Sequence, residues 1–370
     1  MLIGVDASRA LRARRTGTEN YSLQLINRLL VLDRAHDYRL YCDRKPPAGL
    51  FDSASADARV LRFPRLWTHI RLSLEVTRHP PDVLFVPAHV LPLVHPKRSV
   101  VTVHDLGYRY FPEAHSRFGR WYLDASTRYS ARHAAHLLAD SRATRDDLVR
   151  FYGVDPRQVS VVYLGRDESL RPVEDPALLA AVAHRYGLAG RPYVLYLGTL
   201  QPRKNLVRLI EAFDRIRQRH PDLCLVLAGQ RGWLADEIFE RVEQLGLQGQ
   251  VRFPGFVPDA DLAALLTAAR VFAFPSLHEG FGFPILEAQA CGTPVLAANS
   301  SSLPEVAGQA ALLADPLDVA AIAQGLDRML GDEALRDRLR AGGFANVRRF
   351  SWRRCAEETL EVLERVGRSN

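Results

Sequence analysis

The 370-residue chain exceeds the usual size of a single hydrophobic core, so we expect two domains. Hydrophobic residues make up 47% and charged residues 25%, as in ordinary globular proteins, and no run reaches the roughly 18–20 apolar residues that span a bilayer. The four isolated cysteines argue against disulfides and structural zinc, and the apolar start is too short for a signal peptide, so we expect a cytoplasmic protein.

The net charge of +7 is concentrated in the first half of the chain. Residues 1–165 contain 25 Lys and Arg against 16 Asp and Glu, whereas residues 166–370 contain 24 against 26. A basic domain favours an anionic partner, which could be nucleic acid, a membrane surface or a phosphorylated acceptor. The alternative is that the arginines form solvated faces without a partner.

Short apolar, β-branched runs alternate with amphipathic segments along the whole chain. The predicted strands are residues 2–5, 38–42, 83–86, 99–103, 137–139 and 159–162 in the first half, and 193–197, 223–227, 251–253, 271–274, 294–297 and 311–313 in the second. The clearest helical patterns are residues 20–32, 206–219 and 261–269. Such alternation predicts α/β domains with parallel, doubly wound sheets.

We expect an N-terminal domain at 1–165, a linker at 166–176 and a second domain at 177–345. A final helix at 346–370 should pack back toward the first domain. Ligands of doubly wound sheets bind beyond the carboxyl ends of the strands, so the loops that follow strands are the first place to look for a site.

In the first half, His104 and Asp105 directly follow the strand at 99–103. A histidine beside an aspartate in such a loop could order an acceptor or stabilise a reacting group, although a single histidine is more often structural. The fingerprint GxGxxG is absent from the loop after the first strand, which weakens a dinucleotide-binding interpretation.

In the second half, Arg203 and Lys204 lie in the turn that follows the strand at 193–197. Two adjacent cations at a strand-to-helix turn suit a diphosphate, because arginine offers a bidentate fork and lysine a point charge. The third strand of this half leads into a hydrophobic loop that contains Phe256 and Val257. Asp259 and Asp261 follow and spell a DxD pattern, but here N-capping of the next helix is the expected role.

The most informative segment is residues 274–292, FPSLHEGFGFPILEAQACG. Pro284 suits the first turn of a helix and Gly292 suits its C-terminal stop. Gly280 and Gly282 allow close approach of the backbone to a ligand, and the helix N-terminus attracts an anion. Glu279 and Glu287 flank this junction, so the pair could bind hydroxyl groups on either side of a diphosphate.

The spacing Glu279-x7-Glu287 resembles the EX7E signature of the retaining glycosyltransferases of family 4, and the resemblance extends over the whole chain. It implies the GT-B fold, two Rossmann-like domains facing across a cleft. It also implies that Glu279 contacts the hydroxyls of the transferred sugar, that Glu287 holds the ribose, and that Arg203 and Lys204 bind the diphosphate.

The remaining implied donor contacts come from backbone groups and neighbouring loops. They involve the glycine turn of Gly280, Phe281, Gly282 and Phe283, the nucleobase loop of Phe256 and Val257, and Thr199, which stands where many relatives carry an arginine.

On the acceptor side, the resemblance implies that His104 matches a histidine which, in the family, faces the donor sugar. The loop at residues 14–19 is similar to the family's glycine loop near the acceptor, with Gly17 and Thr18 as the matching positions.

Within the family, the chain is similar to bacterial mannosyl- and rhamnosyl-type transferases of surface polysaccharide assembly. This resemblance implies a retaining hexosyltransferase that uses a nucleotide sugar, with GDP-mannose as the first expectation and UDP-glucose as the second, and a saccharide or lipid-linked acceptor. No cofactor, metal or nucleic acid is expected. Cations interleaved with aromatics at residues 62–71, 108–111 and 117–122 favour peripheral attachment to the inner face of an anionic membrane, unless Trp67, Phe118 and Trp121 are core residues. The alternatives are another GT-B enzyme, such as a nucleotide-sugar epimerase or a glucan synthase, and a non-catalytic basic binding protein.

Overall fold

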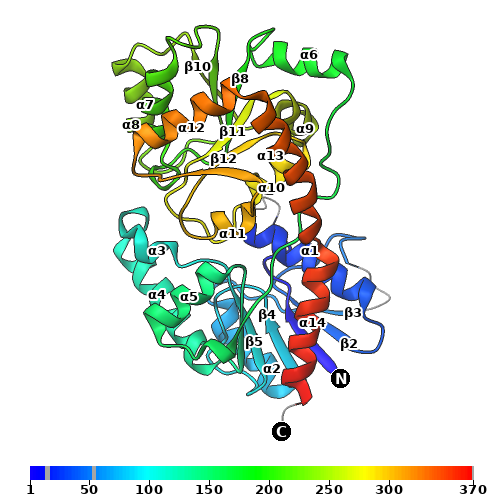
Figure 1. Ribbon diagram of the computed structural model, residues 1–370. Coiled ribbons are helices and arrows are strands. Elements are labelled where there is room, and N and C mark those ends of the chain that lie inside the picture. Colours follow the sequence, from blue (N-terminus) through cyan, green and yellow to red (C-terminus); the bar gives the residue numbers. More distant parts are fainter. Residues whose placement is uncertain (13–16, 52–55, 369–370) are drawn as a thin grey trace. The chain divides into compact units, whose positions relative to one another are not determined.

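The computed structural model describes residues 1–12, 17–51 and 56–368 of the chain. The chain divides into two compact units, residues 1–165 with 350–370 and residues 166–349, coloured along the sequence in Figure 1. Each unit is built around one parallel sheet, which confirms the predicted pair of α/β sheets.

The sheet of the first unit contains seven parallel strands in the order β3-β2-β1-β4-β5-β6-β7. Their bounds are β1 Leu2–Asp6, β2 Asp37–Cys42, β3 Ala56–Val60, β4 Val83–Val86, β5 Ser99–Val103, β6 His136–Ala139 and β7 Val159–Val161. The helices are α1 Gly17–Leu32, the π-helix η1 Trp67–Leu72, α2 Ser73–Arg78, α3 Gly107–Tyr110, α4 Arg117–His133, α5 Arg142–Tyr152 and α14 Trp352–Arg368, with single 3₁₀ turns at Pro112–Ala114 and Pro156–Gln158.

The sheet of the second unit contains six parallel strands in the order β10-β9-β8-β11-β12-β13. They are β8 Tyr193–Leu197, β9 Cys224–Ala228, β10 Val251–Gly255, β11 Val271–Phe274, β12 Val295–Ala298 and β13 Ala311–Ala314. The helices are α6 Pro176–Arg185, α7 Leu206–Ile216, α8 Asp236–Gln244, α9 Asp259–Ala268, α10 Phe283–Ala290, α11 Leu303–Ala307, α12 Val319–Gly331 and α13 Glu333–Asn346, with 3₁₀ turns at Pro202–Lys204 and Val347–Arg349.

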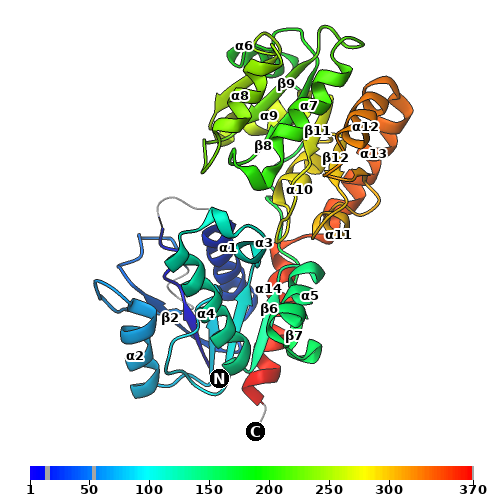
Figure 2. The same ribbon diagram turned by 90° about the vertical axis from the view of Figure 1, so that its left-hand side faces the viewer.

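The central strands form because their side chains are apolar on both faces of the sheet. β4, β8, β9, β11 and β12 are buried along their whole length, as expected where helices cover both faces of a parallel sheet, an arrangement that Figure 2 shows in each unit. Helix α7 buries Leu206, Leu209, Ile210 and Phe213, the i, i+3, i+4, i+7 spacing of one helical face.

One strand of the first sheet was missing from the prediction. β3, with the sequence ADARV, is an edge strand whose side chains are mostly exposed, so it lacks the apolar pattern by which the other strands were identified. The predicted bounds of the other strands agree with the structure to within one or two residues.

The C-terminal helix α14 belongs to the first unit, where it packs against α1 and the strands β4, β5 and β6. The start of α14 lies very close to the backbone at Gly165, because a Cβ on Gly165 would come within 2.3 Å of the backbone nitrogen of Trp352. Among the described residues, no helix has both the length and the apolar character needed to cross a bilayer.

Candidate active site

The loops that follow β8 and β11 carry most of the predicted donor residues of the second unit, and the loop after the next strand, β12, packs against them. These strands are neighbours in the sheet, so their carboxyl ends open on the same edge. The turn after β8 and the loop after β11 are joined directly, because Leu277 donates its backbone N–H to the Arg203 carbonyl at 2.9 Å.

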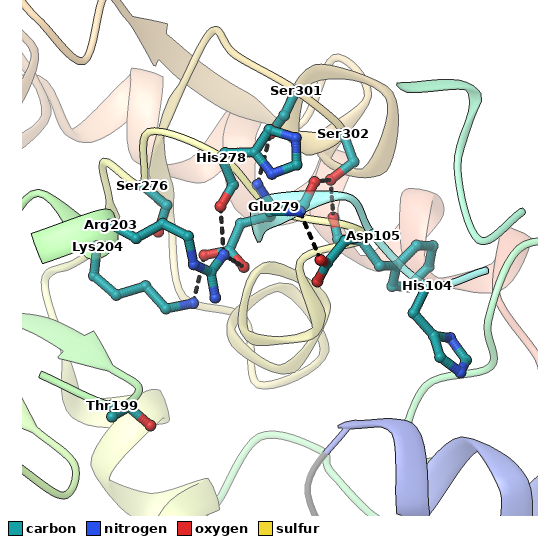
Figure 3. A network of polar contacts seen from close by, with 12 residues as sticks. His104, Asp105, Thr199, Arg203, Lys204, Ser276, His278, Glu279, Ser301 and Ser302 are labelled. Carbon is teal, nitrogen blue, oxygen red and sulfur yellow. Dashed lines mark hydrogen bonds and ion pairs between the residues drawn. The ribbon is translucent and has the colours of Figure 1, made fainter. Parts of the chain in front are cut away.

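The Glu279 carboxylate binds both predicted cations. Its Oε2 lies 2.8 Å from Arg203 Nη1 and its Oε1 lies 2.5 Å from Lys204 Nζ, as Figure 3 shows. Burial alone would raise the pKa of Glu279, but Lys204 and Arg203 outweigh it and hold the pKa below its ordinary value. Glu279 is therefore ionised at neutral pH, and the cluster of one anion and two cations carries a net positive charge.

Asn205 fixes the turn that presents these cations. It adopts a left-handed conformation with φ 61° and is 4% exposed. Its side-chain amide donates to the carbonyls of Pro275 and Pro316 at 3.1 and 2.6 Å, and its oxygen accepts from Arg208 at 2.9 Å. Asparagine suits this position because it tolerates the left-handed region and supplies both donors and an acceptor.

The loop from Glu279 to Gly282 leads into α10. Gly282 lies at the N-cap with φ 115°, and a Cβ there would come within 2.9 Å of Leu303. The backbone angle favours glycine, and a side chain here would also require the Leu303 methyl group to shift. Pro284 occupies the first turn and Gly292, with φ 75°, follows the helix end, as predicted. The positive end of the α10 dipole thus lies beside the Glu279 cluster.

Glu287 lies in the second turn of α10, on the helix side of the junction that it was predicted to flank. Burial raises its pKa to about 7, and the negative charges of Asp167 and Asp259 add to the effect. The two glutamates of the motif therefore differ in environment, because Glu279 has two cations beside it and Glu287 faces other acids.

The other predicted donor residues lie at the same edge of the sheet but outside the ion-pair cluster. Thr199 is exposed in the loop after β8 and stands apart from the network in Figure 3. Phe256, 65% exposed, follows β10 and projects into solvent, while Val257 is buried. Phe281 is buried and packs edge-to-face against Phe283, with ring centroids 5.3 Å apart.

The expected N-capping role of the DxD residues is wrong. The N-cap of α9 is Pro258, and Asp259 and Asp261 lie within the helix. Asp261 forms a salt bridge with Arg185 and accepts a hydrogen bond from Tyr186 at 2.8 Å, so it ties α9 to the α6 region. A proline cannot cap through its side chain, and the acid one turn later is used for a tertiary contact instead.

In the first unit, His104 follows β5 and is 8% exposed. Its Nδ1 lies 2.6 Å from Asp140 Oδ2, and its Nε2 lies 3.2 Å from the Pro87 carbonyl. Burial alone would lower the pKa of His104, but the Asp140 carboxylate outweighs it and raises the pKa. An acceptor at each ring nitrogen stabilises the protonated imidazolium relative to the neutral ring.

The neighbouring groups complete the surroundings of His104. The Tyr21 ring meets it edge-to-face at 4.8 Å, and burial together with the His104 charge lowers the pKa of His89 to about 4. Asp105 accepts a hydrogen bond from the Gly107 backbone at 2.9 Å and so shapes the loop.

Gly17 and Thr18 lie in the first turn of α1, whereas the sequence placed them in a loop. Residues 14–16 of the predicted acceptor loop lie outside the described residues. Glu19, in the same turn, is buried and pairs with Arg9 at 3.6 Å.

Sequence reasoning did not single out Asn205, Asp140, Ser301 or Ser302 as site residues. Asn205 follows the cations directly, so its place in the motif was a usable signal. Asp140 lies 36 residues from His104, and no local pattern links them. Within the described part of the chain, no group of three His, Cys, Asp or Glu side chains is arranged to hold a metal ion, and the four cysteines are buried and unpaired.

The fold and the sequence both match known glycosyltransferases. Residues 15–170 match the family described as Glycosyltransferase Family 4, and residues 185–345 match the family described as Glycosyl transferases group 1. The fold is similar to that of sucrose-phosphate synthase from Thermosynechococcus elongatus, with a TM-score of 0.78 at 22% identity over 99% of this chain and 98% of that one. The architecture is therefore the GT-B fold.

The chain belongs to glycosyltransferase family 4 and is a retaining hexosyltransferase. It is 35% identical to the O-antigen chain mannosyltransferase B of Escherichia coli, with 94% of this chain and 96% of that protein aligned. It is 31% identical to the serotype-specific mannosyltransferase WbdA of Escherichia coli over 74% of this chain, but this alignment covers only 34% of WbdA.

Proposed function

We propose that the chain transfers mannose from GDP-mannose, with retention of configuration, to a saccharide or lipid-linked acceptor during assembly of a surface polysaccharide. The observation that carries this proposal is the cluster of Glu279, Arg203 and Lys204 beside the N-terminus of α10. It offers two cations and a helix dipole to a diphosphate, and a carboxylate to sugar hydroxyls. The choice of mannose rests on the names of the two relatives.

In this proposal the donor binds to the second unit. Arg203 and Lys204 bind the diphosphate, the backbone of Gly280 to Phe283 approaches the sugar and the distal phosphate, and Glu287 accepts hydrogen bonds from the ribose. Phe256 and Val257 flank the base, and Thr199 lines the outer part of the site. Glu279 leaves its two cations as the phosphates replace it and turns to the sugar hydroxyls.

Departure of the diphosphate is assisted by charge. Negative charge grows on the leaving phosphate as the glycosidic bond breaks, and fixed cations stabilise that change without reorganisation. We assign the acceptor to the first unit, near Gly17, Thr18 and the His104 imidazolium. The leaving phosphate accepts the acceptor proton on the same face of the sugar, which accounts for retention.

A panel of nucleotide sugars tests the donor. A ligand that binds only the folded protein raises the free energy of unfolding by about 2.7 kcal/mol when it is present at 100 times its Kd, and the melting temperature rises with it. GDP-mannose and GDP should stabilise the protein more than UDP-glucose and UDP, and transfer should yield an α-linked product by NMR. Stabilisation and turnover with UDP-glucose alone would refute the donor assignment. Release of an altered free nucleotide sugar would instead identify an epimerase.

We further propose that the first unit docks on the cytoplasmic face of an anionic membrane. Apolar side chains are exposed on two segments that touch each other: Leu66 (61%) and Ile70 (46%) on or next to η1, and Phe118 (73%) and Trp121 (63%) on α4. The contact between the segments is the hydrogen bond of His69 to Tyr122, 2.8 Å long.

The same stretches of sequence carry exposed arginines, and one of their aromatic residues, Trp67, is buried. Arg62, Arg65, Arg117 and Arg120 are exposed in the same stretches of sequence as these apolar side chains. Each cation near an anionic surface contributes about 1 kcal/mol. Trp67, in contrast, is a core residue that donates its indole N–H to the Leu61 carbonyl at 2.5 Å.

Vesicle co-sedimentation tests this attachment. The protein should bind vesicles with anionic lipid at low salt and lose binding in the double variant Phe118→Ser, Trp121→Ser. Val31→Ser is the control, because Val31 is 59% exposed on α1 of the same unit. Absence of binding to anionic vesicles, or equal loss in the control, would count against the proposal.

A further inference from the structure

Two serines from a separate segment hold the backbone of the Glu279 turn. Ser301 Oγ accepts the Glu279 N–H at 2.9 Å. The Ser302 hydroxyl lies 2.9 Å from the Glu279 carbonyl and 2.7 Å from the Phe281 carbonyl, so its single O–H is shared between the two acceptors (Figure 3). Residue 279 is thus bonded through its N–H and its C=O to the loop that follows β12.

Ser302 is not used in the way its position suggests. It is the N-cap of α11, where a serine ordinarily bonds a backbone N–H of its own helix, yet it makes no side-chain cap bond. Its hydroxyl, in a fully buried residue, is directed to the Glu279 turn instead.

Ser301 is held in an unfavourable backbone conformation. Its φ of 50° lies in the left-handed region, which costs a residue with a side chain about 1–2 kcal/mol relative to the right-handed form. Glycine would avoid this cost but would lack the acceptor that receives the Glu279 N–H.

The turn needs such support because of its composition. Gly280 and Gly282 give it a large conformational entropy, and a loop that is to bind sugar and phosphate must be fixed before the reaction. We propose that Ser301 and Ser302 are positioning residues that place the Glu279 carboxylate and the backbone amides of the turn for sugar transfer. This inference rests on the proposed role of Glu279.

Three serine variants separate positioning from general stability. Ser302→Ala and Ser301→Ala should lower kcat about 10- to 100-fold, since a displacement of about 1 Å can cost about 100-fold in rate. The affinity for GDP should stay within about threefold of wild type, because Arg203, Lys204 and Glu287 are unchanged. Ser300→Ala is the matched control: its hydroxyl bonds Ser276, three residues before Glu279, and this variant should keep the wild-type kcat.

Ser301→Gly distinguishes a positioning role from a structural one. It relieves the left-handed strain, so its melting temperature should equal or exceed that of wild type, while kcat falls as in Ser301→Ala. A kcat that simply follows the melting temperature across the variants would overturn the proposal, as would a loss in Ser300→Ala equal to that in Ser302→Ala.

Amide hydrogen exchange provides a readout that is independent of turnover. The Gly280 to Gly282 amides should exchange at least about tenfold faster in Ser302→Ala than in wild type or Ser300→Ala. Unchanged exchange would contradict the positioning role. Activity is measured with whichever donor the wild type uses, so a wrong donor assignment would leave the comparison among variants intact.

Discussion

At the scale of single residues, the two glutamates of the motif have opposite electrostatic surroundings. Glu279 is bonded to Arg203 and Lys204, whereas Glu287 has Asp167 and Asp259 as its charged neighbours. One carboxylate therefore remains ionised over the physiological pH range, and the other titrates within it.

Glu279→Gln should lower kcat about 100-fold or more, the effect of removing one charged contact to a reacting group. It also leaves Arg203 and Lys204 without their carboxylate, which should destabilise the unliganded protein by about 3–5 kcal/mol. GDP then supplies the missing negative charge, so the rise in melting temperature with GDP should be larger than in wild type. Differential scanning fluorimetry and kinetics measure both effects.

The control for this prediction is Glu237→Gln, which removes an exposed acid of α8 in the same unit. It should behave as wild type in both assays. Full turnover in Glu279→Gln, or a smaller GDP shift than in wild type, would show that the assignment of Glu279 is wrong.

Glu287 should make nucleotide binding depend on pH. Only the ionised carboxylate accepts hydrogen bonds from both ribose hydroxyls, and its pKa is about 7. The affinity for GDP should therefore increase between pH 6 and 8 and level off above. Calorimetric titration across this range measures it, and Glu287→Gln should remove the increase. A profile that is the same in both proteins would contradict the prediction.

The same pKa has a consequence for folding. The folded-state pKa is raised above its ordinary value, so the folded protein holds this proton more tightly than the unfolded chain does. The contribution of Glu287 to stability is consequently lost as pH rises from about 4.5 through 7. Glu287→Gln should lose less stability than wild type over that interval in urea titrations.

At the scale of elements, the entry into α10 depends on a left-handed glycine. Gly282→Ala would combine a φ of 115° with a Cβ 2.9 Å from Leu303, so it should destabilise the protein by about 1–3 kcal/mol. It should also weaken donor binding, because the helix N-terminus shifts. Urea unfolding measures the first effect and GDP titration the second.

Gly249→Ala is the matched control for the glycine, because nothing lies within 4 Å of a Cβ at that position in the same unit. It should be neutral or slightly stabilising, since alanine has less conformational freedom in the unfolded chain. Equal stability of the two variants would mean that the α10 entry tolerates another conformation.

At the scale of the whole molecule, activity should not require a divalent metal. Arg203, Lys204 and the α10 N-terminus supply positive charge where a metal would otherwise neutralise the diphosphate. Transfer rates should be the same with excess EDTA as with magnesium. Activity that is lost on chelation and restored by magnesium or manganese would contradict this.

The local sequence determined most of the secondary-structure elements and the Glu279-x7-Glu287 motif of this protein. Apolar runs and helical spacing are properties of neighbouring residues, so they predicted two parallel α/β sheets and most strand positions. The stretch from Glu279 to Gly292 identified the family for the same reason, since its glycines, proline and acids act within one strand–loop–helix unit. The polar edge strand β3 was not predicted, because it forms by pairing with β2 and has no apolar pattern of its own.

Only the tertiary structure decided which distant groups meet. Arg203 and Lys204 pair with an acid about 75 residues away, His104 pairs with Asp140, and Ser302 turns from its own helix to the Glu279 carbonyl. Burial is likewise a property of the fold, which places Trp67 in the core and Trp121 on the surface although both lie in similar basic segments. Strand order and loop geometry set these contacts, and neither is encoded in the spacing of adjacent residues.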